Sequence, residues 1–132
     1  MTAFNRPYLV GQEIDNILAA HESAHLSGNG NFTQSCEKLL CKITGASHAL
    51  LTHSCTGALE IATLLAGIGP GDEVIMPSYT FVSTANAVVL RGATPVFVDI
   101  RPDTLNIDVA EVAKAISTRT RAIMPVDYAG VP

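Results

Sequence analysis

Positive charge is scarce in this sequence. Lysine and arginine number 8 against 12 acidic residues, and the formal net charge at pH 7 is −4. A chain that binds nucleic acid needs a basic patch to neutralise the phosphates. The composition therefore argues against a nucleic-acid partner.

Long apolar runs and an even set of cysteines are lacking as well. Glu60, Asp72 and Glu73 interrupt the most apolar region, so no run reaches the roughly 18 residues that suggest a membrane-spanning helix. The start, MTAFN, lacks the basic residues and apolar core of a secretory signal. The 3 cysteines are an odd number without the spacing of a metal site, which favours reduced thiols. We therefore expect a cytoplasmic protein without a membrane partner.

Apolar content is sufficient for a folded core. Hydrophobic residues make up 48% and charged residues 15% of the 132 positions, a composition typical of folded rather than disordered chains. A chain of this length can form one domain with its own core.

Hydrophobic periodicity divides the chain into alternating helices and strands. Helical spacing predicts helices over residues 12–24, from an N-cap at Thr33 to Gly45, and over 56–67, 81–91 and 109–116. Short apolar runs between turn residues predict strands over 48–52, 73–76, 94–99 and 121–126. Such alternation indicates an α/β fold, in which helices cover both faces of a mostly parallel sheet. The helix over 56–67 is apolar nearly all round, so we expect it to be buried on more than one side.

Residues 53–60, HSCTGALE, join a predicted strand to the start of a helix. The first N–H groups of a helix lack partners within it, and together with the positive end of the helix dipole they favour an anion. Ser54 and Thr56 add hydroxyl donors, and Gly57 allows close approach to the backbone. An ordinary helix cap explains the same hydroxyl residues. The residues alone leave both interpretations open.

Three other motifs give weaker signals. Residues 21–25, HESAH, match the H-E-x-x-H pattern of zinc peptidases, but they precede a glycine loop, and a solvated helix end is the favoured interpretation. Cys55 could be a nucleophile at a helix start, although a buried small side chain is favoured because no base is placed beside it. Tyr79 and Phe81 lie just beyond a strand, at the edge where α/β proteins bind ligands, and packing is the alternative.

Six segments together carry more information than any single motif. They are FNRP at 4–7, GNGNFT at 28–33, SCTGALE at 54–60, GDEVIMPSYTFVSTAN at 71–86, RGATPVFVDI at 91–100 and NID at 106–108. In order and spacing they resemble the DegT/DnrJ/StrS family of sugar-nucleotide aminotransferases, over nearly the whole chain. The resemblance is closest to the branch that makes dTDP-4-amino-4,6-dideoxygalactose for enterobacterial common antigen.

The resemblance implies an enzyme that uses pyridoxal 5'-phosphate (PLP), has the aspartate-aminotransferase fold (fold type I) and works as a homodimer. Such an enzyme moves an amino group from glutamate to a dTDP-4-keto-6-deoxy sugar for surface polysaccharide, including lipopolysaccharide, biosynthesis. At the matching positions Thr56 and Gly57 hold the PLP phosphate, and Phe81 stacks on the pyridine ring. Tyr79 stays unassigned.

The sequence departs from the family pattern in two ways. Asp127 stands where the family usually has a histidine. The sequence also stops before the family's pyridine-nitrogen aspartate and Schiff-base lysine, and its own lysines at 38, 42 and 114 match neither. We therefore expect no catalytic residue in this chain. Residues 1–132 are interpreted as an incomplete N-terminal part of the PLP-binding large domain, with the N-terminal helix and active-site loop over 1–33 and alternating helix and strand units over 34–132.

Alternatives to an aminotransferase fragment stay open. Within the family, a PLP-dependent sugar dehydratase fits. Two alternatives are not enzymes of this family. One is a non-catalytic remnant that binds PLP or pairs with full-length subunits, and the other is an unrelated anion-binding domain. In the family's sheet the first strand pairs with the last, so three neighbouring strands and one unpaired strand are expected here. The isolated chain should then expose apolar surface and self-associate.

Overall fold

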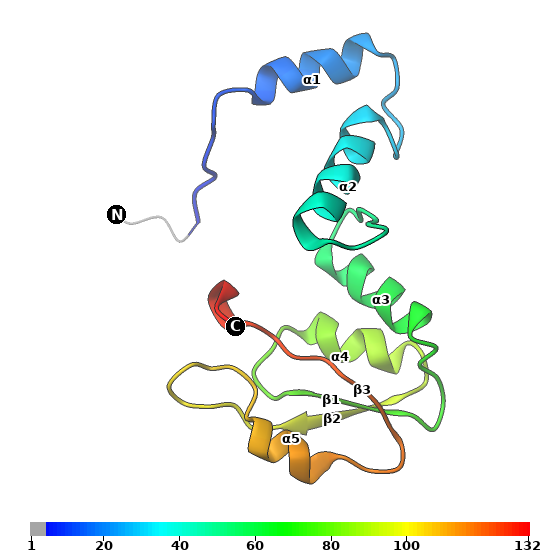
Figure 1. Cartoon of the computed structure of the whole chain (residues 1–132), viewed down its shortest axis with the longest axis vertical. Coiled ribbons are helices and arrows are strands. Elements are labelled where there is room, and N and C mark those ends of the chain that lie inside the picture. The colour runs from blue at the N-terminus through cyan, green and yellow to red at the C-terminus, as the bar shows by residue number, and fades with distance from the viewer. Residues whose placement is uncertain (1–4) are drawn as a thin grey trace. The chain divides into compact units, whose positions relative to one another are not determined.

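A computed structural model describes residues 5–132, and the chain divides into two compact units, Met1–Leu51 and Thr52–Pro132 (Figure 1). Phe4, the first residue of the segment 4–7, lies outside the described residues. The boundary predicted after residue 33 is not tested by this division and stays a prediction.

The first unit contains the helices α1 (Glu13–Glu22) and α2 (Asn31–Thr44). Helix α2 begins where the N–H of Gln34 donates to the carbonyl of Gly30 at 3.1 Å. Gly30 is the N-cap, in extended conformation at φ −76° and ψ −177°. The predicted N-cap at Thr33 is therefore wrong, because glycine can start a helix without a side-chain bond. The predicted end at Gly45 is confirmed by its left-handed φ of 74°.

The second unit alternates helices and strands. In chain order these are α3 (Cys55–Leu65), β1 (Glu73–Pro77), α4 (Val82–Val89), β2 (Thr94–Val98), α5 (Val109–Ala115), β3 (Thr120–Ile123) and the 3-10 turn η1 (Tyr128–Gly130). The strands lie in the order β2-β1-β3, and both pairs are parallel. Ile75 in the central strand lies opposite Val96 on one side and Ile123 on the other.

Helices cover the two faces of this sheet (Figure 1). On one face Val74 and Met76 of β1 pack against Val88 of α4. On the other face Ile75 packs with Val98 and with Val112 of α5. The parallel α/β arrangement predicted from the sequence is therefore confirmed.

Of two expectations about the start of this region, one agrees with the structure and one is wrong. Within the described residues the sheet has three neighbouring strands, and residues 48–52 pair with none of them, as expected of the one unpaired segment. An extended segment without a neighbour cannot complete its backbone hydrogen bonds as a strand. Helix α3 buries Thr63, but Leu64 and Leu65 are 54% and 76% exposed. Among the described elements α4 is its main packing neighbour.

Candidate functional site

Helices α3 and α4 run side by side in the same direction. The hydroxyl oxygens of Thr56 and Ser83, each in the first turn of its helix, are 2.8 Å apart. Further along, the Thr63 hydroxyl donates to the carbonyls of Ala87 (3.3 Å) and Glu60 (2.9 Å). The first turn of α3 thus contacts the first turn of α4, and a later residue of α3 contacts a later residue of α4. Both helices therefore begin at the same end of the pair.

This common end lies at the carboxyl edge of the sheet. Helix α4 follows β1 after a short loop, so its N-terminus is next to the end of that strand. Open parallel sheets bind ligands outside the carboxyl ends of their strands. The positive ends of two helix dipoles meet there, which favours an anion.

The N-terminus of α3 combines a cap with unused donors. Ser54 is the N-cap, and its hydroxyl accepts a hydrogen bond from the N–H of Gly57 at 3.1 Å. The capping interpretation is therefore confirmed. Among the residues described, the N–H groups of Cys55 and Thr56 have no hydrogen-bond acceptor. The half-buried Thr56 hydroxyl adds a third donor for an anion when Ser83 donates in the bond between the two hydroxyls.

Gly57 borders a small space beside these donors. A Cβ added to Gly57 would meet the Oγ of Ser54 at 3.6 Å, the Cβ of Thr52 at 3.7 Å and the Cε1 of His53 at 3.8 Å. These are ordinary van der Waals distances, so alanine fits this position without a clash. The missing side chain leaves that space open for a ligand atom.

Phe81 lies at the start of α4. It is the N-cap residue, with extended backbone at φ −73° and ψ 147°, and its side chain is 75% exposed. Two residues on, Ser83 contacts Thr56. The fold thus brings the three residues predicted for cofactor binding to the same end of the α3–α4 pair, where an exposed ring could stack on a flat ligand.

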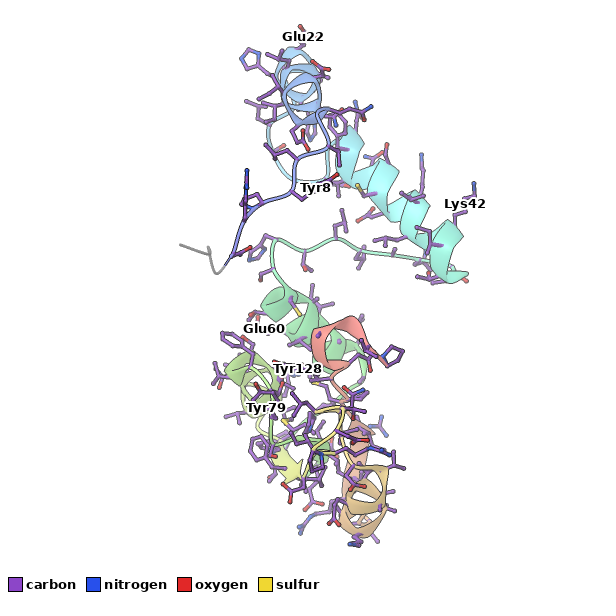
Figure 2. All side chains as sticks on the ribbon, turned by 90° about the vertical axis from the view of Figure 1, so that its left-hand side faces the viewer. Tyr8, Glu22, Lys42, Glu60, Tyr79 and Tyr128 are labelled. Atoms are coloured by element: carbon purple, nitrogen blue, oxygen red, sulfur yellow. The ribbon has the colours of Figure 1, made fainter. Side chains whose placement is uncertain are left out.

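A tyrosine pair occupies the same edge of the sheet. Tyr79 follows β1 and Tyr128 follows β3, and their rings lie next to one another with centroids 5.2 Å apart (Figure 2). Their hydroxyl oxygens are 3.4 Å apart, and this contact raises the pKa of Tyr79. The Asn106 side chain accepts from the Tyr128 N–H at 2.8 Å and donates to the Val131 carbonyl at 2.9 Å. These hydrogen bonds join the loops that follow β1, β2 and β3.

The weaker sequence motifs form no centre in the described part of the chain. In residues 5–132 no group of three histidine, cysteine or acidic side chains is arranged to hold a metal ion. The His25 ring instead lies within hydrogen-bond distance of the Gly28 carbonyl (3.3 Å) and the Ser27 hydroxyl (3.2 Å). Cys55 is exposed, so its predicted burial is wrong; it is the first residue of α3. None of the helices in residues 5–132 combines the length and apolarity that a bilayer crossing requires.

Comparison with known proteins decides the family. The sequence profile of the DegT/DnrJ/EryC1/StrS aminotransferase family matches residues 7–132. The chain belongs to this family.

Several known proteins resemble the chain closely in sequence and structure. The spore coat polysaccharide biosynthesis protein SpsC of Bacillus subtilis (strain 168) is 44% identical over 127 residues, which are 96% of this chain and 32% of SpsC. The crystal structure of 3-amino-5-hydroxybenzoic acid synthase matches 96% of this chain and 33% of its own, with 38% identity and a TM-score of 0.88. The PLP form of Spr1654 from Streptococcus pneumoniae matches 99% of this chain and 33% of its own, with 33% identity and a TM-score of 0.88.

These comparisons confirm three expectations from the sequence: the family, the fold type I class and, for the family, PLP as cofactor. The chain spans about a third of the length of the relatives that it matches. The roles of Thr56, Gly57 and Phe81 stay predictions. The donor set at α3, two N–H groups and one hydroxyl, fits a phosphate group.

Several residues at this edge were missed by sequence reasoning. Ser83, Asn106 and Tyr128 contact predicted residues or their neighbours through bonds between segments distant in sequence. The run of hydroxyl residues around Phe81, TFVST over 80–84, is a signal that could have indicated Ser83.

Proposed function

We propose that this chain contains the phosphate-binding and ring-stacking part of the PLP site of a sugar-nucleotide aminotransferase. The observation that supports this most is the meeting of the α3 and α4 N-termini, with Thr56, Gly57 and Phe81 at one end of the pair. PLP, when bound, acts as an electron sink for amino-group transfer.

Each residue has a separate part in this proposal. Thr56 donates its hydroxyl and backbone N–H to phosphate oxygens, and the Cys55 N–H adds a third bond. Gly57 leaves room for the phosphate beside the helix start. Phe81 fixes the plane of the cofactor ring. No residue of this chain is proposed to move the proton or carry the cofactor aldehyde, because Lys38, Lys42 and Lys114 lie on helices outside any matching motif.

For the complete natural protein we propose transfer of the glutamate amino group to a dTDP-4-keto-6-deoxy sugar, by a cytoplasmic homodimer. Segments 71–86 and 91–100 resemble sugar-nucleotide aminotransferases, and this resemblance supports the substrate class. SpsC is named for spore coat polysaccharide biosynthesis, which is consistent with an amino sugar destined for a surface polysaccharide. More specifically, we propose that the protein belongs to the branch that makes dTDP-4-amino-4,6-dideoxygalactose for enterobacterial common antigen.

An amino-transfer assay on the full natural protein tests the reaction. With PLP, glutamate and a dTDP-4-keto-6-deoxy sugar we expect 2-oxoglutarate and an aminated sugar nucleotide. Phe81→Ala should raise the PLP concentration needed for half-maximal rate by about 2- to 12-fold, because an aromatic stack contributes roughly 0.5–1.5 kcal/mol. Phe97→Ala, which removes a 53% exposed ring from β2, is the matched control and should change it little.

Two results would contradict the proposal. A dehydrated sugar without 2-oxoglutarate would assign the dehydratase activity instead. PLP binding without any turnover of keto-sugar nucleotides would favour a non-catalytic protein.

A further inference from the structure

Among the described residues, Ser83 makes the hydrogen bond that crosses the helix pair at the proposed phosphate site. Its Oγ is 2.8 Å from the Oγ1 of Thr56. Ser83 is 9% exposed, whereas Thr56 is half-buried. The bond therefore joins an inner hydroxyl to one at the edge of the site.

The Thr56 hydroxyl differs in its partner from the hydroxyls of Thr44 and Thr63 and, like that of Thr84, bonds another hydroxyl. A threonine hydroxyl in a helix can bond a carbonyl three or four residues earlier. Thr44 does so to Leu40 at 2.8 Å, and Thr63 does so to Glu60 at 2.9 Å. Thr56 is the second residue of α3, so no helical turn precedes it, and its hydroxyl contacts Ser83 on the neighbouring helix.

A hydroxyl group has one proton to donate. When Ser83 donates to Thr56, the Thr56 proton is left for a third atom. Such a chain of hydroxyl groups also polarises each member. An anion in front of Thr56 would select this arrangement, because an anion accepts and cannot donate.

We propose that Ser83 is a positioning residue for phosphate binding: it fixes the Thr56 hydroxyl by donating to it and leaves the Thr56 proton for the phosphate. This rests on the proposed function, since it requires a phosphate at Thr56. Ser83 acts through Thr56 and does not touch the ligand.

A double-mutant cycle in the full natural protein tests this role. Dissociation constants for PLP and for pyridoxal, which lacks the phosphate, are measured for the parent, Ser83→Ala, Thr56→Val and the double variant. Ser83→Ala should weaken PLP binding by about 3- to 10-fold, the effect of one ordinary hydrogen bond, and leave pyridoxal binding unchanged. In the Thr56→Val background it should cause no further loss.

Thr63→Val is the matched control, because it removes the other hydroxyl link between the same helices. It should leave the ratio of PLP to pyridoxal affinity unchanged. A similar loss of that ratio in Thr63→Val would show that helix packing, and not hydroxyl positioning, is responsible. A full additional loss in the double variant, equal losses for PLP and pyridoxal, or no loss in Ser83→Ala would each overturn the inference.

Failure of the inference and failure of the proposed function give different results. If the parent protein shows no preference for PLP over pyridoxal, the phosphate site itself is wrong. If the parent shows the preference and Thr56→Val removes it, while Ser83→Ala has no effect on it, then Ser83 alone has been misassigned.

Discussion

Glu73 is the most enclosed charged residue of the second unit. Its carboxylate, 11% exposed, accepts from the Ser117 hydroxyl at 2.5 Å and forms an ion pair with Arg119. These two partners lower the pKa of Glu73. Ser117 and Arg119 precede β3, so the carboxylate connects the starts of two neighbouring strands. The cluster is therefore structural and lies at the edge of the sheet opposite to the proposed site.

The lowered pKa gives a pH-dependent stability. A carboxyl group whose pKa is lower in the folded state contributes stability above its unfolded pKa, about 4.3 for glutamate, and loses it as the pH falls through the folded value. Glu73→Gln should lower the free energy of unfolding at pH 7 and flatten its decline below about pH 4.3. Urea unfolding of the natural protein at pH 7 and pH 3.5 measures both effects.

Glu111→Gln is the control for this experiment, because Glu111 pairs with Lys114 at 2.6 Å on an exposed helix surface. Exposed pairs contribute little, so its unfolding free energy should change by less than about 0.5 kcal/mol. An acid dependence that is the same in Glu73→Gln and the parent protein would show that the pair does not stabilise the fold.

At the scale of elements, the end of α4 depends on one glycine. Gly92 has a left-handed φ of 75°, and an added Cβ would lie 3.1 Å from the Cγ of Pro70. Gly92→Ala should therefore lower the unfolding free energy by about 1–2 kcal/mol, since an L-residue is strained in this conformation. Gly69→Ala, with no atom within 4 Å of the added Cβ and without a positive φ, should have a much smaller effect.

Urea unfolding of the two glycine variants gives the comparison. Equal midpoints for Gly92→Ala and Gly69→Ala would contradict the strain argument. A larger loss for Gly92→Ala than strain explains would indicate that Pro70 cannot shift.

Elements whose partners are close in sequence were predictable. The strand over 73–76, the turn before it and the helix after it follow from local patterns, and the structure places β1 and α4 there. The burial of α3 was predicted wrongly, because it depends on neighbours that an apolar pattern does not identify. The bond between Thr56 and Ser83 was missed for the same reason, since it joins two helices.

At the scale of the whole molecule, apolar side chains remain exposed on most elements. Examples from α1, α2 and α3 are Ile17 (62%), Ile43 (71%) and Leu65 (76%). Exposed apolar surface of this kind favours association. We expect the 132-residue chain expressed alone to sediment as oligomers whose size rises with protein concentration. A monomer that unfolds in one cooperative transition would contradict this expectation.

Phosphate recognition at the start of α3 is the central claim, and the affinity of the full natural protein for PLP relative to pyridoxal tests it most directly. A bond from a charged phosphate to Thr56 should contribute roughly 1.5–3 kcal/mol, so Thr56→Val should reduce the preference for PLP by about 10- to 100-fold. Thr44→Val removes a hydroxyl that bonds the backbone of α2, and it should leave the preference intact. Equal affinities of the parent protein for PLP and pyridoxal, or a preference that survives Thr56→Val unchanged, would contradict the account.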